Sequence, residues 1–281
     1  MQQIVNRETD PLANAANTPL IEVKDLYCIY GEHYTLIDID WEVQKGENWV
    51  VFGLNGSGKT TLLSILAGYN AFTSGSVEVF GEEYTNDNIY KNRCRIGWVS
   101  SSFFDKYLSW ESVKDVVLSG ATGTLSRGKQ LCDEDTKKAF MLLKKLGIRE
   151  KAEQPYIWLS KGERQNVIIA RALMCSPEII ILDEPVNGFD VYARERMFRT
   201  IEDLAKNEKM TIIYVTHYVE EILPVFEKAI LLKAGQIRYN GKLSELFTSE
   251  QMSELLQQNA SVEIINGKYV LKVAAESIFG K

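Results

Sequence analysis

A glycine-rich segment between two apolar runs constrains this chain more than any other feature. Gly53–Thr61 reads Gly-Leu-Asn-Gly-Ser-Gly-Lys-Thr-Thr; Trp49–Phe52 precedes it and Leu62–Ala67 follows. An apolar strand, a glycine-rich turn and a helix in this order form the setting of a phosphate-binding loop. Glycines permit backbone conformations in which successive N–H groups surround one anion, and the first turn of the helix adds more donors. We therefore expect a nucleotide phosphate site, with a ligand-free turn as the alternative.

Two side chains of this loop have predicted roles. Lys59 is expected to reach the β- and γ-phosphates, and the Thr60 hydroxyl to ligate Mg²⁺. The predicted phosphate-binding residues are Gly53, Leu54, Asn55, Gly56, Ser57, Gly58, Lys59, Thr60 and Thr61.

Composition narrows the classes of protein. A net charge of −6 over 281 residues argues against a dedicated nucleic-acid binder, so no nucleic-acid partner is expected. The four cysteines lie far apart in the sequence and are expected to be reduced thiols, without a disulfide or zinc. No apolar run has the length of a membrane span, and the start of the chain lacks a signal-peptide core. Any role at a membrane is therefore expected to depend on a partner.

The patterning divides the chain into three parts. Residues 1–18 are polar and aperiodic, and a flexible tail is expected there. Residues 19–240 are expected to form the main domain, with a helical subdomain at about 104–157. Residues 241–281 predict a small appendage, with a helix at 244–258 followed by a hairpin around Asn266-Gly267.

Two kinds of sheet are expected in the main domain. Short strands at 20–26, 34–43, 77–81 and 95–99 predict an antiparallel sheet beside the nucleotide site. Ile179–Leu182 and Thr211–Val215 are unbroken β-rich apolar runs, which are typical of parallel strands buried on both faces.

Two carboxylates follow the first of these buried strands. Asp183 and Glu184 end the Ile179–Leu182 run, and ligands of open α/β sheets bind at the carboxyl ends of strands. Asp183 is expected to hold Mg²⁺ through water, and Glu184 to orient or deprotonate the attacking water. The alternative is a pair of surface acids capping a helix.

Four motifs in a fixed order resemble a known family. The phosphate loop, the Leu159-Ser160-Lys161-Gly162-Glu163 segment, the strand ending in Asp183-Glu184-Pro185, and Thr216-His217 are similar to the ATPase subunit of ABC (ATP-binding cassette) proteins over about residues 20–240. The resemblance implies an α/β P-loop NTPase fold of the ABC type. Its parts would be a RecA-like core, an antiparallel β subdomain and a helical subdomain.

The resemblance also implies roles for single residues. Tyr30 matches the aromatic residue that stacks on adenine, although a core tyrosine at a strand end is the alternative. Ser160, Gly162 and Glu163 match the signature segment, which contacts the γ-phosphate held by the opposite subunit. Asp190 matches the loop that crosses the dimer interface.

Three further positions complete the comparison with the family. His217 matches the switch histidine that senses the γ-phosphate, so Glu184, His217 and Lys59 are the implied catalytic residues. Two positions depart from the pattern. Lys161 stands where glycine is usual, and a side chain that points to solvent would be tolerated there. Ser101 stands near the position of a glutamine that helps to ligate Mg²⁺, so Ser101 is a candidate contact of the metal through water.

The implied function is hydrolysis of ATP with Mg²⁺. A single copy cannot complete its own site, so a second copy of the same or a homologous ATPase subunit is an implied partner. The second implied partner is an integral-membrane permease on a separate chain. Such a partner would place this chain at the cytoplasmic face of the membrane. The resemblance favours an importer. The alternatives are a soluble ABC ATPase of iron–sulfur assembly or ribosome or nucleic-acid association, and a cassette that binds ATP without hydrolysis.

Overall fold

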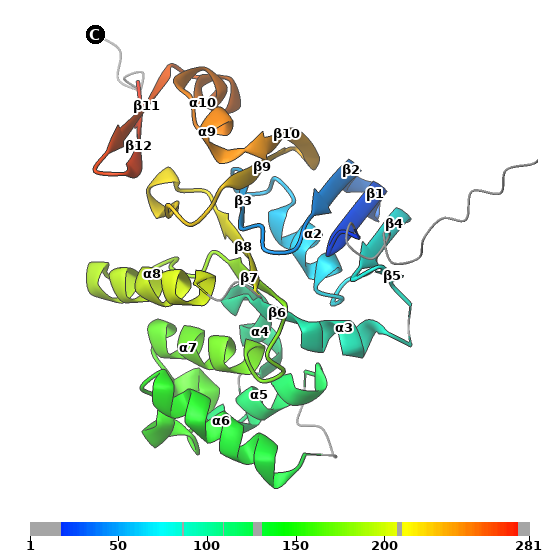
Figure 1. Ribbon diagram of the computed structural model, residues 1–281, viewed down its shortest axis with the longest axis vertical. Helices are drawn as coiled ribbons and strands as arrows, with labels where there is room; N and C mark the ends of the chain where they lie inside the picture. Colours follow the sequence, from blue (N-terminus) through cyan, green and yellow to red (C-terminus); the bar gives the residue numbers. More distant parts are fainter. Residues whose placement is uncertain (1–17, 86, 109, 126–130, 207–209, 275–281) are drawn as a thin grey trace, which may run out of the picture.

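The computed structural model describes residues 18–85, 87–108, 110–125, 131–206 and 210–274 (Figure 1). Except for Thr18, the expected N-terminal tail lies outside the described residues, as does the end of the expected appendage. Within the described ranges, every helix is too short or too polar to span a bilayer.

A six-stranded sheet carries the core, in the order β10-β9-β3-β8-β7-β6. Neighbouring strands are parallel from β9 to β6, and only β10 is antiparallel. The strands β3, β8, β7 and β6 are buried along their whole length, which confirms the parallel interpretation of the two apolar runs. The strands are β3 (Trp49–Phe52), β6 (Ile96–Val99), β7 (Ile179–Asp183), β8 (Thr211–Thr216), β9 (Lys228–Lys233) and β10 (Gln236–Lys242).

A smaller antiparallel sheet has the order β2-β1-β4-β5. Its strands alternate between buried and exposed positions, because only one face packs on the core. They are β1 (Ile21–Tyr30), β2 (His33–Val43), β4 (Ser74–Val79) and β5 (Glu82–Glu83). The expectation that the strand at 95–99 joins this sheet is wrong. β6 instead pairs in parallel with β7, and all four of its residues are buried.

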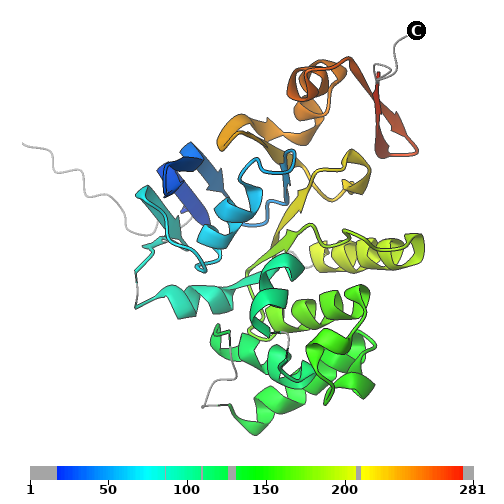
Figure 2. The same cartoon turned by 180° about the vertical axis from the view of Figure 1, so that it is seen from behind.

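Helix α2 (Lys59–Leu66) begins inside the glycine-rich segment, next to the small sheet (Figure 1). The chain from α3 to α7 is mainly helical, and α5, α6 and α7 pack on one another at one end of the molecule (Figures 1 and 2). These helices are α3 (Ile89–Arg95), α4 (Ser101–Leu108), α5 (Val113–Ser119), α6 (Asp133–Lys145) and α7 (Lys161–Ala172), with 3₁₀ turns η1 (Gly120–Thr122), η2 (Arg149–Lys151) and η3 (Tyr156–Trp158).

The remaining elements follow β7. Helix α8 (Val191–Ala205) lies alongside the sheet, and the 3₁₀ turn η4 (Val219–Glu221) connects β8 to β9. The last elements lie at the end of the molecule opposite α5–α7 (Figure 2). They include the expected antiparallel hairpin, and they are α9 (Leu243–Leu246), α10 (Ser249–Leu256), β11 (Ala260–Ile265) and β12 (Lys268–Val273).

Candidate functional site

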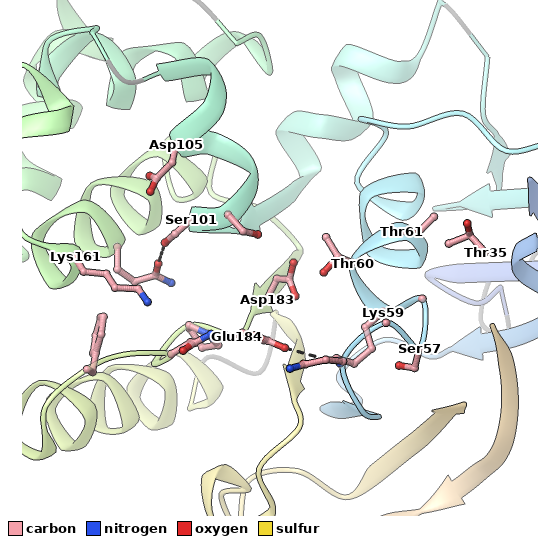
Figure 3. Close-up of a pocket in the computed structure, with 18 residues that line it drawn as sticks. Thr35, Ser57, Lys59, Thr60, Thr61, Ser101, Asp105, Lys161, Asp183 and Glu184 are labelled. Atoms are coloured by element: carbon pink, nitrogen blue, oxygen red, sulfur yellow. Dashed lines mark hydrogen bonds and ion pairs between the residues drawn. The ribbon is translucent and has the colours of Figure 1, made fainter. Parts of the chain in front are cut away.

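The largest concentration of predicted site residues lies around one cavity of about 560 Å³ (Figure 3). It sits at the carboxyl ends of the parallel strands: the loop follows β3, Ser101 follows β6, and Asp183 ends β7. Such edges are where open α/β sheets bind ligands. The predicted residues that line it are Asn55, Gly56, Ser57, Gly58, Lys59, Thr60, Thr61, Ser101, Asp183 and Glu184.

The glycines of the loop serve two different requirements. Gly56 and Gly58 have φ angles of 78° and 103°, a region that residues with a side chain rarely adopt. Gly53 has no positive φ, so the expectation that it supplies an unusual conformation is wrong. A Cβ atom there would lie 2.3 Å from the Leu232 carbonyl oxygen, so the need at position 53 is for space.

Lys59 is the buried cation of the cavity, with a side chain only 5% exposed. Its Nζ donates to the carbonyl oxygens of Gly53 at 2.8 Å and Leu54 at 3.1 Å, and lies 3.8 Å from Glu184 Oε1. Burial lowers the pKa of Lys59, and the negative charges of Glu184 and Asp183 oppose that shift. A desolvated ammonium group held only by neutral carbonyls and one distant carboxylate is prepared to bind phosphate oxygens.

Asp183 is the buried carboxylate. Ser100 Oγ donates to Asp183 Oδ2 at 3.0 Å. Burial raises the pKa of Asp183 to about 6; the hydrogen bonds from Ser100 and Thr60 lower it, while the charge of Glu184 raises it. The protein's own groups therefore compensate this carboxylate poorly, and a cation would stabilise its charged form.

Glu184 is the more accessible acid and has a left-handed backbone, with φ of 47°. Its Oε1 lies 3.0 Å from His217 Nδ1, and its Oε2 accepts from Asn187 Nδ2 at 3.2 Å. His217 follows β8, the strand beside β7. The two contacts hold the Glu184 carboxylate facing Lys59, which fits a group that orients and deprotonates a water molecule.

Three buried polar atoms around the cavity have no hydrogen-bond partner within the described part of the chain. They are Ser57 Oγ, Asp183 Oδ1 and Gln165 Nε2. Buried polar groups are nearly always paired, so these atoms are positioned to bind a polar ligand. Carboxylate and hydroxyl oxygens are the ligands that Mg²⁺ prefers, and the free oxygen of Asp183 beside Thr60 fits that ion.

Comparison with known proteins decides the family. The family model described as "ABC transporter" matches residues 36–187. The chain belongs to this family. It is 44% identical over 222 residues to the ABC transporter ATP-binding protein YlmA of Bacillus subtilis, covering 78% of this chain and 84% of that protein. It is 33% identical over 235 residues to the zinc uptake system ATP-binding protein ZurA of Listeria innocua, covering 80% and 90%.

Solved cassettes have the same fold. A bacterial ABC transporter cassette solved as a dimer matches with a TM-score of 0.69 and 28% identity, covering 79% of this chain and 98% of that one. CbiO1 of Clostridium perfringens, part of the ABC transporter complex cbiONQ, matches with a TM-score of 0.67 and 26% identity, covering 85% and 94%. The P-loop fold and the assignment as an ATP-hydrolysing transporter subunit are thereby confirmed. Nothing in these matches supports the soluble alternative.

Eight predicted residues do not line this cavity. Gly53, Leu54 and His217 contact Lys59 or Glu184, which do line it; the other five are Tyr30, Ser160, Gly162, Glu163 and Asp190. Tyr30 ends β1 and is 51% exposed. Ser160 Oγ accepts from the Glu163 N–H, and a Glu163 carboxylate oxygen accepts from the Ser160 N–H at 3.0 Å, which caps α7. Asp190 caps α8 by accepting from the Ala193 N–H at 2.8 Å.

The structure also places residues in the cassette's cavity (Asn187 and Gln165) or beside it (the buried Ser100) that the sequence did not reveal. Ser100, Asn187 and Gln165 contact predicted site residues. The position of Ser100 directly after the apolar strand β6 is a sequence signal that could have identified this residue. No such signal marks Asn187 or Gln165. Lys161 is exposed, and its side chain lies against Gly188 and lines the cavity (Figure 3).

Proposed function

We propose that this cassette hydrolyses MgATP in a head-to-tail pair with a second cassette. We further propose that hydrolysis drives solute import through a separate permease, at the cytoplasmic face of the membrane. The observation that carries the proposal is the meeting of Lys59, Asp183 and Glu184 around one cavity, with His217 on Glu184.

The residues divide the chemistry of hydrolysis among them. The loop N–H groups and Lys59 would hold the β- and γ-phosphates. Glu184 accepts a proton from water while the water oxygen bonds to the γ-phosphorus, and the bond to the bridging oxygen breaks to give ADP and phosphate. His217, whose Nδ1 lies 3.0 Å from Glu184 Oε1, fixes the position of that carboxylate relative to the γ-phosphate. Bound Mg²⁺, held by Thr60 and by Asp183 through water, would neutralise developing negative charge.

A second copy is proposed because several predicted site residues of this chain do not line its own cavity. Tyr30 would stack on adenine, whereas Ser160, Gly162, Glu163 and Asp190 lie outside the cavity and would serve the ATP of the partner. The relative solved as a dimeric cassette supports this arrangement. Ser101 remains a candidate contact of the metal through water.

Importer function is supported by the relatives. ZurA of Listeria innocua is named for zinc uptake, and TauB of Shigella dysenteriae, 33% identical over 218 residues, for taurine import. CbiO1 is part of a transporter complex. A permease on another chain fits the finding that none of the described helices could cross a bilayer. Purification of the tagged chain from membranes should recover a polytopic protein, and repeated failure would refute the proposed partner.

Substitution of Glu184 tests the assigned base. Glu184→Gln removes the proton acceptor but keeps the shape, so hydrolysis should fall at least about 100-fold while ATP binding persists. Glu220→Gln, which changes an exposed glutamate of η4, is the matched control and should keep full activity. Normal turnover by the Glu184 variant would refute the role given to Glu184.

A further inference from the structure

Gln165 stands apart among the residues that line the ATP cavity. It lies on α7, five residues after Ser160, and is 2% exposed. Its Nε2 is one of the three unpaired buried atoms described above; the other two belong to Ser57 and Asp183 of the predicted site. A buried amide with a free N–H costs folding free energy, so the fold alone gives no reason for glutamine at this position.

The other end of the Gln165 amide is bonded. Ser101 Oγ donates to Gln165 Oε1 (dashed in Figure 3). The preceding residue, Ser100, is fully buried and donates to Asp183 Oδ2 at 3.0 Å. Two adjacent serines, Ser100 after β6 and Ser101 at the start of α4, therefore connect α7 on one side with the buried carboxylate on the other.

A second contact strengthens the attachment of α7 to α4. Arg164, next to Gln165, donates from Nη1 to Asp105 Oδ2 at 3.0 Å. Asp105 lies one helical turn after Ser101, so both bonds involve the same face of α4. Tyr156 also donates to Asp105, at 2.7 Å. Helix α7 thus holds the first turns of α4 at two points, and the position of Ser100 depends on both.

We propose that Gln165 is a positioning residue of the ATPase site. Through Ser101 and Ser100 it fixes the Asp183 carboxylate, so that the position of the signature helix α7 sets the geometry of the metal-binding side of the cavity. This role rests on the proposed function. It also gives Ser101 a role in the site besides a contact with the metal through water, since the Ser101 hydroxyl donates to Gln165 of α7.

Gln165→Met tests the link because methionine has a similar length and no amide. Groups that orient metal ligands typically change metal affinity about 10- to 100-fold when removed. In a Glu184→Gln background, which prevents turnover, the Mg²⁺ concentration needed for half-maximal enhancement of ATP binding should rise by roughly 10-fold. ATP binding without Mg²⁺ should stay within about twofold, because Asp183 then contributes little.

The double variant separates positioning from general damage. Ser101→Ala removes the same hydrogen bond, so Ser101→Ala with Gln165→Met should cost no more than either change alone. Asn166→Leu is the control: it breaks the neighbouring bond from α7 to the Leu146 carbonyl and should lower the melting temperature without shifting the Mg²⁺ dependence.

Two results would overturn the inference. One is an unchanged Mg²⁺ dependence in both single variants; the other is additive losses in the double variant. If Gln165→Met does not fold, Ser101→Ala alone decides the first point. Absence of MgATP hydrolysis in the wild-type protein would instead refute the proposed function.

Discussion

The two sides of the proposed composite site differ in how they are held. Around the cavity, Lys59 and Asp183 are buried, and Glu184 contacts His217 at the end of β8 as well as the nearby Asn187. On the signature side, Ser160 and Asp190 are exposed, and each bonds only to the first turn of its own helix.

This difference indicates which parts of the site one chain can complete. The tertiary fold positions the phosphate side, so it should bind ATP in a single copy. On the signature side, Ser160 and Asp190 act as helix caps, which are stable without any tertiary partner, although Glu163 also pairs with Lys151 of η2. The signature side should therefore contribute to ATP hydrolysis only when a second copy is present.

The largest expected effect is at Lys59. Lys59→Met keeps the side-chain length and removes the charge, so ATP affinity should fall by roughly 100-fold because charge-assisted bonds to phosphate are lost. The melting temperature should not fall, because burial already penalises the lysine charge. Equilibrium binding and thermal unfolding measure the two quantities. Lys137→Met on the exposed side of α6 is the control, and ATP affinity equal to wild type in the Lys59 variant would contradict the assignment.

Ser160 should separate ATP binding from hydrolysis. Ser160→Asp retains a good N-cap but places a negative charge where the partner's phosphate would lie. Like charges across an interface cost several kcal/mol, so hydrolysis should fall by more than about 100-fold. Binding of ATP to one copy should stay within about twofold. A parallel loss of binding would show that Ser160 contacts the ATP of its own chain.

The pKa of Asp183 predicts a pH-dependent stability of the nucleotide-free protein. The folded pKa of about 6 exceeds the ordinary 3.8, so this group contributes stability below about pH 4 that is lost as the pH rises through 6. Asp183→Asn should therefore stabilise the protein at pH 8 by about 3 kcal/mol. The gain should shrink towards pH 4. Melting curves across this range test it, and a gain independent of pH would contradict it.

Tyr30 should have the smallest effect. Stacking on adenine is worth about 0.5–1.5 kcal/mol, so Tyr30→Ala should weaken ATP binding about two- to tenfold. Tyr30→Phe keeps the ring and should bind as wild type. Because Tyr30 is 51% exposed, neither change should alter the melting temperature much. An equal loss in both variants would indicate a role for the hydroxyl instead of the ring.

The sequence predicted the features that depend on local pattern. The loop, the two buried strands and the paired acids are contiguous signals, and the structure places Gly56, Lys59, Asp183 and Glu184 around one cavity. The strand at 95–99 was assigned to the wrong sheet, because four residues carry too little periodicity to distinguish an antiparallel edge from a buried parallel strand.

Tertiary contacts account for what the sequence did not predict. The bond between Ser101 and Gln165 joins residues 64 positions apart, and no local pattern marks it. Gly53 was correctly expected in the loop, but its close approach to Leu232 depends on β9, which follows it by more than 170 residues. The orientation of Lys161 likewise depends on Gly188.

The mass of Glu184→Gln in solution with MgATP tests the central claim most directly. The account predicts an ATP-dependent particle of twice the 31.9 kDa of one chain, and its loss when Ser160→Asp is added. A Glu184→Gln protein that remains a monomer while saturated with ATP would contradict the composite site.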